Sequence, residues 1–397
     1  MTSEWNHFAL GEITELVIDY RGKTPKKLGG DWCKQGYRAL SAKNIKTGRI
    51  VQAETIRYID ESLYRKWMKD EVQRGDILIT SEAPFGQIFF WDSDEKIVLS
   101  QRLFCVRIKP EYDARFIYYY MTTPEFQSEL DGRATGTTVI GLRQPELMKC
   151  IIRCPEIQEQ KVIAAILSSI DAKIIANEKV NDNLYAQAKA IFDNHFINID
   201  AIPAGWRKGN LLDIANYLNG LAMQKFRPQG HEIGLPVLKI KELRQGSCDD
   251  SSELCSLSIK PEYIIHNGDV IFSWSGSLLV DIWCGGTCGL NQHLFKVTSD
   301  VYDKWFYYLW TAHHLARFIA IAADKATTMG HIKREELAKA EVLIPCEEDY
   351  TSFNSIMQPI FELIISNRIE SRKLAALRDE LLPKLMTGEI DVSDVQL

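Results

Sequence analysis

The sequence has no hydrophobic run long enough to cross a membrane, since none approaches the roughly 18 residues that a transmembrane helix needs. It also begins without the basic segment and apolar core of a secretory signal peptide. These absences predict a cytoplasmic protein whose nine cysteines are reduced. The 46% hydrophobic content is typical of globular proteins, and 397 residues are enough for two or three domains.

The sequence also lacks the common motifs of nucleotide and cofactor chemistry. It contains no G-x4-G-K-[ST] phosphate-binding loop and no G-x-G-x-x-G turn after a strand. Neither the Asn/Asp-Pro-Pro-aromatic tetrapeptide of an amino-methyltransferase nor a glycine-rich S-adenosylmethionine loop is present. We therefore expect that the chain catalyses no reaction by itself and binds no cofactor.

Two clusters leave other chemistries open. Cys284, Cys288 and His293 have metal-like spacing, but they lack an obvious fourth ligand, so buried thiols are favoured over zinc. Asp94 and Glu95 belong to an acid-x-acid-Lys segment that a nuclease could use, although a solvated hairpin turn is the favoured interpretation. We expect neither cluster to bind a metal.

An internal repeat organises the chain. Trp5 matches Trp206 at an offset of 201, and Phe104 matches Phe295 at an offset of 191. From Pro155 onwards the offset stays at 190 through two long helical segments. Because the offset changes only in the first part of each copy, the sequence predicts two copies of a globular head followed by a long helix.

The two helical segments are expected at residues 156–196 and 350–384. Apolar residues recur in both at alternating spacings of four and three, which is the 3.5-residue period of a coiled coil. Asn177 and Asn367 occupy the same repeat position, where a buried amide fixes register at a cost in stability. At about 1.5 Å per residue, some 38 residues form a rod of roughly 57 Å. We expect the two helices to pair antiparallel, with seam residues Ile163, Leu167, Ile170, Ile174, Asn177, Leu184, Ile360, Ile364, Asn367 and Leu374.

Each head is expected to be α+β, with strands first and a helix after them. The helix is predicted at residues 113–130 in the first head and at 302–322 in the second. The predicted boundaries are 1–155 for the first head, 156–197 for the central helix, 198–345 for the second head, 346–390 for the C-terminal helix and 391–397 for a tail. The fold class is thus α+β, with two similar heads separated by two long helices in a pseudo-two-fold antiparallel coiled coil.

Positive charge is concentrated locally, although the net charge is −6. Nine basic residues and one acid, Asp31, lie between Arg21 and Arg49. Local charge matters more than the sum, because salt screens fields beyond roughly 8 Å. The interspersed aromatic and amide side chains suit a nucleic-acid surface, and the second head has a comparable basic region.

The candidate DNA-binding residues are Arg21, Lys23, Lys26, Lys27, Arg38, Lys43, Asn44, Lys225, Arg227, Lys239, Lys241 and Arg244. Two threonine-containing loops, residues 135–143 and 326–333, are secondary candidates. Plain helix-entry loops explain these two loops equally well. Taken alone, the first basic stretch is better explained by a solvated loop face. The repeat favours the interpretation as a DNA-binding surface. Half-sites on one face of B-DNA lie about 34–36 Å apart, and two heads that fold inward on such a rod can span this distance.

Residues 155–167, 202–206 and 374–390 resemble segments of a known family, the specificity subunits of type I restriction–modification systems. Residues 155–167 (PEIQEQKVIAAIL) resemble the central conserved segment of these subunits. Residues 202–206 (IPAGW) resemble the opening of their second recognition domain, and residues 374–390 resemble their C-terminal end. The likeness covers the whole chain and both repeats. The first head departs from the family by lacking the Pro-x-Gly-Trp lead, and residues 346–350 lack the Gln-Glu-Gln sequence.

The resemblance implies a non-catalytic subunit with two target recognition domains, each reading one half of a gapped, asymmetric site in double-stranded DNA. It implies two modification (methyltransferase) subunits docked on the helices, with S-adenosylmethionine bound to those subunits. Where unmethylated DNA is also cleaved, it implies two restriction subunits that use ATP and Mg. Base-contacting positions do not transfer, since the heads differ between family members.

A second function remains open, that of a non-catalytic coiled-coil adaptor whose heads bind proteins. Retention of DNA at low salt and co-purification of a methyltransferase would discriminate against it. A third, a nuclease using Asp94 and Glu95, is disfavoured, and metal-dependent cleavage by the purified chain would be its signature.

Overall fold

A computed structural model of the chain describes residues 5–136, 140–324, 332–393 and 395. The chain divides into two compact units, which we call unit 1 (Met1–Asp171 with Ala376–Leu397) and unit 2 (Ala172–Ala375). Each unit contains one sheet-rich head and part of two long helices, α6 (Ile157–Phe192) and α11 (Glu347–Met386). No helix among the described residues is long and apolar enough to span a membrane.

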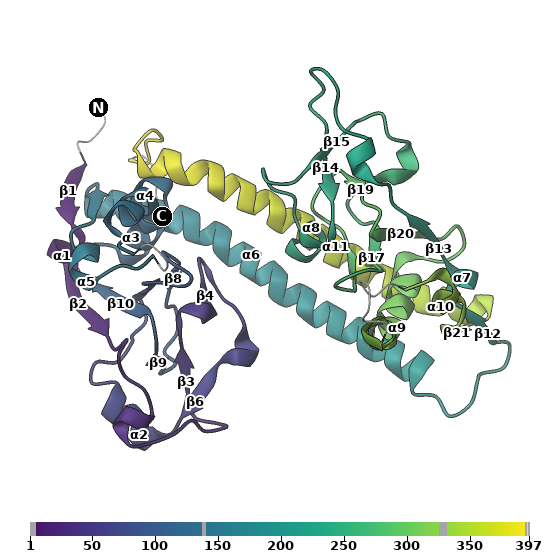
Figure 1. Cartoon of the computed structure of the whole chain (residues 1–397), viewed down its shortest axis with the longest axis horizontal. Helices are drawn as coiled ribbons and strands as arrows, with labels where there is room; N and C mark the ends of the chain where they lie inside the picture. Colours follow the sequence, from purple (N-terminus) through teal and green to yellow (C-terminus); the bar gives the residue numbers. More distant parts are fainter. Residues whose placement is uncertain (1–4, 137–139, 325–331, 394, 396–397) are drawn as a thin grey trace. The chain divides into compact units, whose positions relative to one another are not determined.

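The main sheet of unit 1 is four-stranded and antiparallel, in the order β2-β10-β7-β8 (Figure 1). Its strands are β2 (Thr14–Asp19), β10 (Leu103–Ile108), β7 (Ile77–Thr80) and β8 (Ile88–Phe90). A second sheet consists of β6 (Arg57–Ile59), β3 (Tyr37–Leu40) and β9 (Val98–Leu99) in that order. Two short pairs complete the unit, β1 (Asn6–Ala9) with β11 (Ile151–Cys154) and β4 (Ile45–Lys46) with β5 (Arg49–Ile50).

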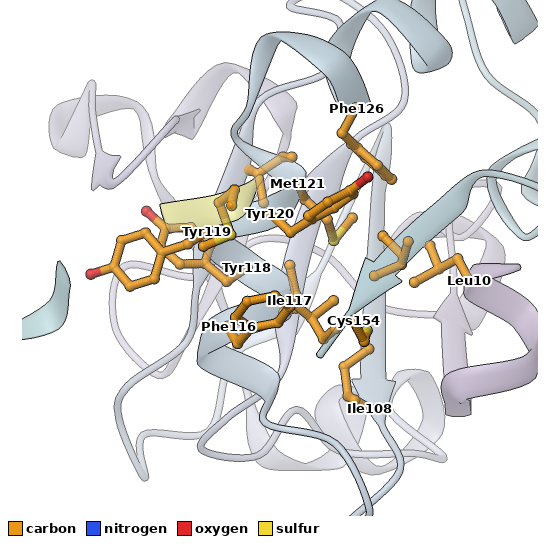
Figure 2. Packing of buried hydrophobic residues seen from close by; sticks show 14 of the residues in the cluster. Leu10, Ile108, Phe116, Ile117, Tyr118, Tyr119, Tyr120, Met121, Phe126 and Cys154 are labelled. Carbon is orange, nitrogen blue, oxygen red and sulfur yellow. The ribbon is translucent and has the colours of Figure 1, made fainter. Parts of the chain in front are cut away.

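The core of unit 1 is built around α3 (Ala114–Met121), which buries every side chain from Phe116 to Met121. Figure 2 shows these side chains packed with Leu10, Ile108 and Cys154. Ile163 and Leu167 of α6 belong to the same cluster, so the helix is part of the core of the head. The other helices are α1 (Leu10–Ile13), α2 (Glu61–Trp67), α4 (Pro124–Arg133) and α5 (Gln144–Leu147), with 3-10 turns at Lys26–Leu28, Ala42–Asn44 and Ala53–Thr55.

The single helix predicted at residues 113–130 is wrong, because the chain forms two helices there. α3 ends at Met121, and α4 begins at Pro124. Thr123 caps the new helix by accepting from the Phe126 N–H, and proline fits the first helical position because it has no N–H to leave unpaired. The second head has no such proline, so its helix is continuous.

Unit 2 repeats the architecture. Its main sheet has the order β13-β20-β17-β18, with strands β13 (Asn216–Asn219), β20 (Leu294–Thr298), β17 (Val270–Ser273) and β18 (Leu279–Ile282) (Figure 1). A second sheet consists of β15 (Leu254–Cys255), β14 (Leu235–Leu238), β19 (Cys288–Leu290) and β16 (Ile264–Ile265). The remaining pair is β12 (Arg207–Asn210) with β21 (Glu341–Ile344).

The helices of the second head are α7 (Leu211–Ile214), α8 (Ile240–Gln245), α9 (Lys304–Asp324) and α10 (Arg334–Ala338). 3-10 turns lie at Met223–Lys225 and Pro261–Tyr263, and a π turn at Asp193–Ile197 follows α6.

The registers confirm that the heads are copies of one fold. Phe104 pairs with Asp19 in unit 1, and its repeat partner Phe295 pairs with Asn219 in unit 2. Leu40 lies beside Leu99 in a parallel pair, as Leu238 lies beside Leu290. Strand for strand, the two heads can therefore be compared residue by residue.

Within each unit the two long helices pack against each other and run antiparallel, as the heptads predict. In unit 2, Asn177 Nδ2 donates to Glu370 Oε2 (2.7 Å) and lies 3.2 Å from Ser371 Oγ. Four residues further along α6, Asn181 Oδ1 accepts from Asn367 Nδ2 at 2.9 Å. As the residue number rises along α6, the number of the contacting residue on α11 falls, so the two helices run antiparallel. In unit 1, Asp171 pairs with Arg378 at 2.8 Å in the same sense.

The predicted seam residues are all buried or half-buried, as residues of a packed helix–helix seam should be. Asn177 is 3% exposed, and the predicted seam residues Ile163, Leu167 and Ile170 of α6 are buried. On α11, Ile364 is buried, while Ile360, Asn367 and Leu374 are half-buried. Ile174 and Leu184 of α6 are also half-buried.

Each head is fastened to its long helix by one equivalent hydrogen bond. In unit 1 the Asp113 N–H donates to Gln160 Oε1 at 2.9 Å, and Gln160 Nε2 donates to the Pro155 carbonyl at 2.8 Å. In unit 2 the Asp303 N–H donates to the hydroxyl of Tyr350 at 2.7 Å. Tyr350 stands 190 residues after Gln160, which is the offset of the repeat. In the second copy the tyrosine hydroxyl therefore accepts the hydrogen bond that the glutamine side chain accepts in the first.

Candidate nucleic-acid interface

The two heads place basic side chains at equivalent points after their inner strands. Lys43 and Lys46 stand three and six residues after Leu40, the last residue of β3. Lys241 and Arg244 stand three and six residues after Leu238, the last residue of β14. All four side chains are exposed. The repeat thus preserves a pair of exposed cations at one place in each head.

In unit 1 a short hairpin beside Lys43 carries further basic side chains. Lys46 and Arg49 are directly paired across the turn between β4 and β5. Both are exposed, as is Lys43, and none of the three forms an ion pair within the described part of the chain. Thr47 and Gly48 form the two-residue turn, and Gly48 has a φ of +77° that suits glycine. We call Lys43, Lys46 and Arg49 the hairpin cations.

Three of the predicted DNA contacts, in the loop before β3, have hydrogen-bond partners within the head. Arg21 donates to both carboxylate oxygens of Asp19 (2.8 Å each) and lies over the ring of Phe104. Lys23 Nζ donates to the Trp67 carbonyl at 2.5 Å, and burial lowers the pKa of its ammonium group. Lys27 Nζ donates to the Gly22 carbonyl at 2.8 Å. Lys26 is exposed and forms no ion pair within the described residues.

Two further candidates of the first head also have internal partners. Arg38 makes a two-pronged ion pair with Glu95. Asn44 is 1% exposed, and its Oδ1 accepts from the Ser41 N–H while its Nδ2 donates to Thr55 Oγ1. Glu242 of the second head holds the equivalent place, because it is buried and accepts from the Lys239 N–H. Asn44 is therefore part of the turn that presents Lys43 rather than part of the exposed surface.

In unit 2 the basic candidates divide in the same way. Arg227 and Lys239 share Glu253, and their hydrogen bonds lower the pKa of that carboxyl. Lys241 donates to Ser251 Oγ at 2.8 Å and lies 3.7 Å from Asp249. Lys225 and Arg244 are exposed without an ion pair in the described residues.

The acidic residues at positions 92–95, which a nuclease could use, form ion pairs with arginines. Arg74 binds both Asp92 and Asp94, and its hydrogen bond lowers the pKa of Asp94. Glu95 is the partner of Arg38. Among the described residues, no group of three or more His, Cys, Asp or Glu side chains could hold a metal ion. Cys284 and Cys288 lie in different hydrophobic clusters, and His293 Nδ1 contacts Ser275 Oγ.

The threonine-containing loops fall partly outside the described residues, which exclude 137–139 and 325–331. Sequence reasoning counted Lys46 and Arg49 among the basic residues but did not select them as contacts. The signal that could have selected them is the Thr47-Gly48 pair between short apolar-flanked strands, which is typical of a two-residue hairpin.

These features define a class of protein with a duplicated head, an antiparallel helix pair and an exposed basic surface on each head. Residues 2–185 match a family model described as the type I restriction modification DNA specificity domain. The type I restriction enzyme MjaIX specificity subunit of Methanocaldococcus jannaschii is 27% identical over 347 residues, which cover 81% of this chain and 79% of that protein. The MjaVIII specificity subunit of the same organism is 28% identical over 196 residues, covering 48% of this chain and 45% of that protein.

A crystal structure of the type I restriction-modification S subunit from M. genitalium has the same fold, with a TM-score of 0.59 over 96% of both chains at 15% identity. The chain is thus similar in sequence to type I restriction enzyme specificity subunits, and residues 2–185 are similar to the DNA specificity domain of that family.

Proposed function

We propose that this chain is the DNA-reading subunit of a type I restriction–modification complex, in which each head contacts one part of a gapped, asymmetric site. The observation that carries this proposal is the equivalence of Lys43 and Lys46 in one head with Lys241 and Arg244 in the other. Exposed cations attract phosphates, and phosphate contacts hold a protein in register on the duplex. Two differing heads that share this anchor can read two different sequences.

The same proposal assigns the chemistry to other subunits. Two modification subunits, which bind S-adenosylmethionine and methylate adenine, dock on α6 and α11. Two restriction subunits join where the complex also cleaves DNA with ATP and Mg. The chain contributes no catalytic residue, and the complex acts in the cytoplasm.

Hydroxyl-radical footprinting of the purified complex tests the proposal. We expect two protected segments with an accessible segment between them, and weaker protection of one segment only when Lys241 and Arg244 are both replaced by Gln. A single uninterrupted footprint that weakens throughout in this variant would contradict the two-head arrangement. Absence of any DNA binding at low salt would favour an adaptor with protein-binding heads.

A further inference from the structure

In the first head, the loop after β7 and the turn before β10 carry a charged pair that is not among the candidate contacts above. Glu82 Oε1 lies 2.9 Å from Arg102 Nε, and the Ser81 N–H donates to the Arg102 carbonyl at 2.9 Å. The Arg102 side chain is 47% exposed. A guanidinium has five N–H donors, and a two-pronged contact with one carboxylate uses two of them, so donors of Arg102 remain for a ligand.

The backbone at this charged pair is strained. Arg102 has a φ of +66°, and Ala83, which follows Glu82, has a φ of +43°, values that favour glycine. Among the described residues, Gln52 is the one other non-glycine residue with a positive φ. An exposed ion pair contributes little to stability, so the contact with Glu82 does not explain why an arginine is held in this conformation. Strained residues of this kind cluster at functional sites, which indicates a functional role for the Arg102 side chain.

The charged pair lies beside the hairpin cations. One residue before Arg102, the Gln101 carbonyl accepts from the N–H of Ala42 at 3.1 Å, and Ala42 directly precedes the first of the hairpin cations. At the end of the loop after β7, Gln87 Oε1 accepts from the N–H of Thr47 in the hairpin turn at 3.1 Å. Both segments that carry the charged pair are therefore hydrogen-bonded to the segment that carries the hairpin cations.

The second head holds a different pair of side chains at the same place. The strand registers put His293 at the position of Arg102 and Ser275 at the position of Glu82. Ser275 Oγ lies 2.9 Å from His293 Nδ1. One place in the fold thus carries an arginine with a carboxylate in the first head and an imidazole with a hydroxyl in the second. Such a difference suits two heads that read different base pairs, because side chains distinguish the base edges.

We propose that Arg102 reads one guanine in the half-site of the first head, while Glu82 holds its guanidinium in position. Arginine donates two hydrogen bonds to the O6 and N7 atoms of guanine in the major groove, which is the commonest base-specific contact. A side chain that is already held by a carboxylate loses less conformational freedom on binding. The inference rests on the proposed DNA-reading function and adds to it a residue that specifies one base.

Duplex binding by the complex of this chain with its modification subunits tests the assignment. The duplexes carry the site found by mapping methylated adenines, and a set of variants replaces each specified base pair in turn. The proteins are the unmodified chain, Arg102→Gly, Glu82→Gln and the control Arg65→Gln, whose arginine is exposed and paired with Glu61. Binding is measured at a salt concentration low enough for every protein to bind.

We expect Arg102→Gly to bind the intact site about ten-fold or more weakly and to lose discrimination at one G·C pair of one half-site. Discrimination at every other pair should remain. Glu82→Gln should weaken discrimination at the same G·C pair, because the guanidinium is then held less firmly. The control should bind and discriminate as the unmodified chain does.

Heating the same proteins separates base reading from a structural role. Glycine adopts a φ of +66° without strain, so Arg102→Gly should unfold at the same temperature as the unmodified chain or a higher one. A lower unfolding temperature with discrimination retained at every base pair would show that Arg102 only supports its turn, and would overturn the inference.

Three binding results would also overturn it. These are unchanged discrimination in Arg102→Gly, loss of discrimination at an A·T pair, and equal loss at all pairs. If the mapped site is gapped and has two parts, each of these results contradicts only the role of Arg102. If no two-part site is found, the DNA-reading function itself is contradicted.

Discussion

The basic side chains of the first head differ in whether they have a partner within the head. Arg21, Lys23 and Arg38 lie in the most basic stretch of the sequence, yet each has a partner within the head. The hairpin cations, Lys43, Lys46 and Arg49, have none in the described residues. The density of positive charge along the sequence therefore does not show which of these side chains have internal partners.

The hairpin cations give a direct prediction. Replacing Lys43, Lys46 and Arg49 with Gln should weaken DNA binding for every sequence tested, and the dependence of log affinity on log salt should become shallower by about one for each phosphate that the protein no longer neutralises. Salt titrations of fluorescently labelled duplexes would measure both effects. The control is Lys149→Gln, an exposed lysine whose partner is Glu146. A salt slope that is unchanged in the triple variant would show that the hairpin faces away from the DNA.

A second residue-scale prediction concerns the joint between head and helix. Gln160 is 2% exposed, and Gln160→Leu would remove the hydrogen-bond partner of the half-buried Asp113 N–H and of the buried Pro155 carbonyl. A buried unpaired polar group costs about 1–3 kcal/mol, so the variant should unfold at a lower temperature. Circular dichroism during heating would show it. The matched control is Gln158→Leu, two residues away and exposed, which should unfold as the unmodified chain does.

At the scale of elements, the long helices were the most predictable part of the molecule. Their heptad pattern is local and predicted that they pair, whereas the internal repeat predicted the antiparallel direction and the shared position of Asn177 and Asn367. The break between α3 and α4 was missed, although Thr123-Pro124 is a local cap signal. The pairing of Lys23 with a carbonyl 44 residues away, and of Arg38 with a carboxylate 57 residues away, could not be predicted because no short-range pattern encodes such contacts.

The helix pair also carries an element-scale prediction. Inserting one heptad into both α6 and α11 within unit 2, for example after Ile174 and after Glu370, keeps the seam in phase and lengthens each helix by about 10.5 Å. The unspecified gap in the recognised site should grow by about three base pairs, at about 3.4 Å per base pair, while both half-sequences stay the same. Sequencing of methylated sites would measure the gap. An altered half-sequence with an unchanged gap would contradict this role of the helices.

At the scale of the whole molecule, duplication explains both what the heads share and where they differ. The strand orders, the helix joints and the exposed cations after the inner strand recur in both copies. The place of Arg21 and Asp19 in one head is taken by Leu221 and Asn219 in the other, and the repeat aligns these positions only once the strand registers are known.

The net charge of −6 is consistent with this division of roles. A uniformly basic chain would bind DNA without regard to its sequence, whereas local clusters on an otherwise acidic chain limit attraction to particular surfaces. Under the proposed function, the exposed cations of each head hold the duplex, and the parts of the heads that differ read the bases.

The most direct test is to map methylated adenines in cells that produce this protein together with its modification subunit. The account predicts a two-part motif with an unspecified gap, one part for each head, and replacement of residues 198–345 by the corresponding head of a relative should change one part only. A short continuous motif, or a change in both parts after the replacement, would contradict it.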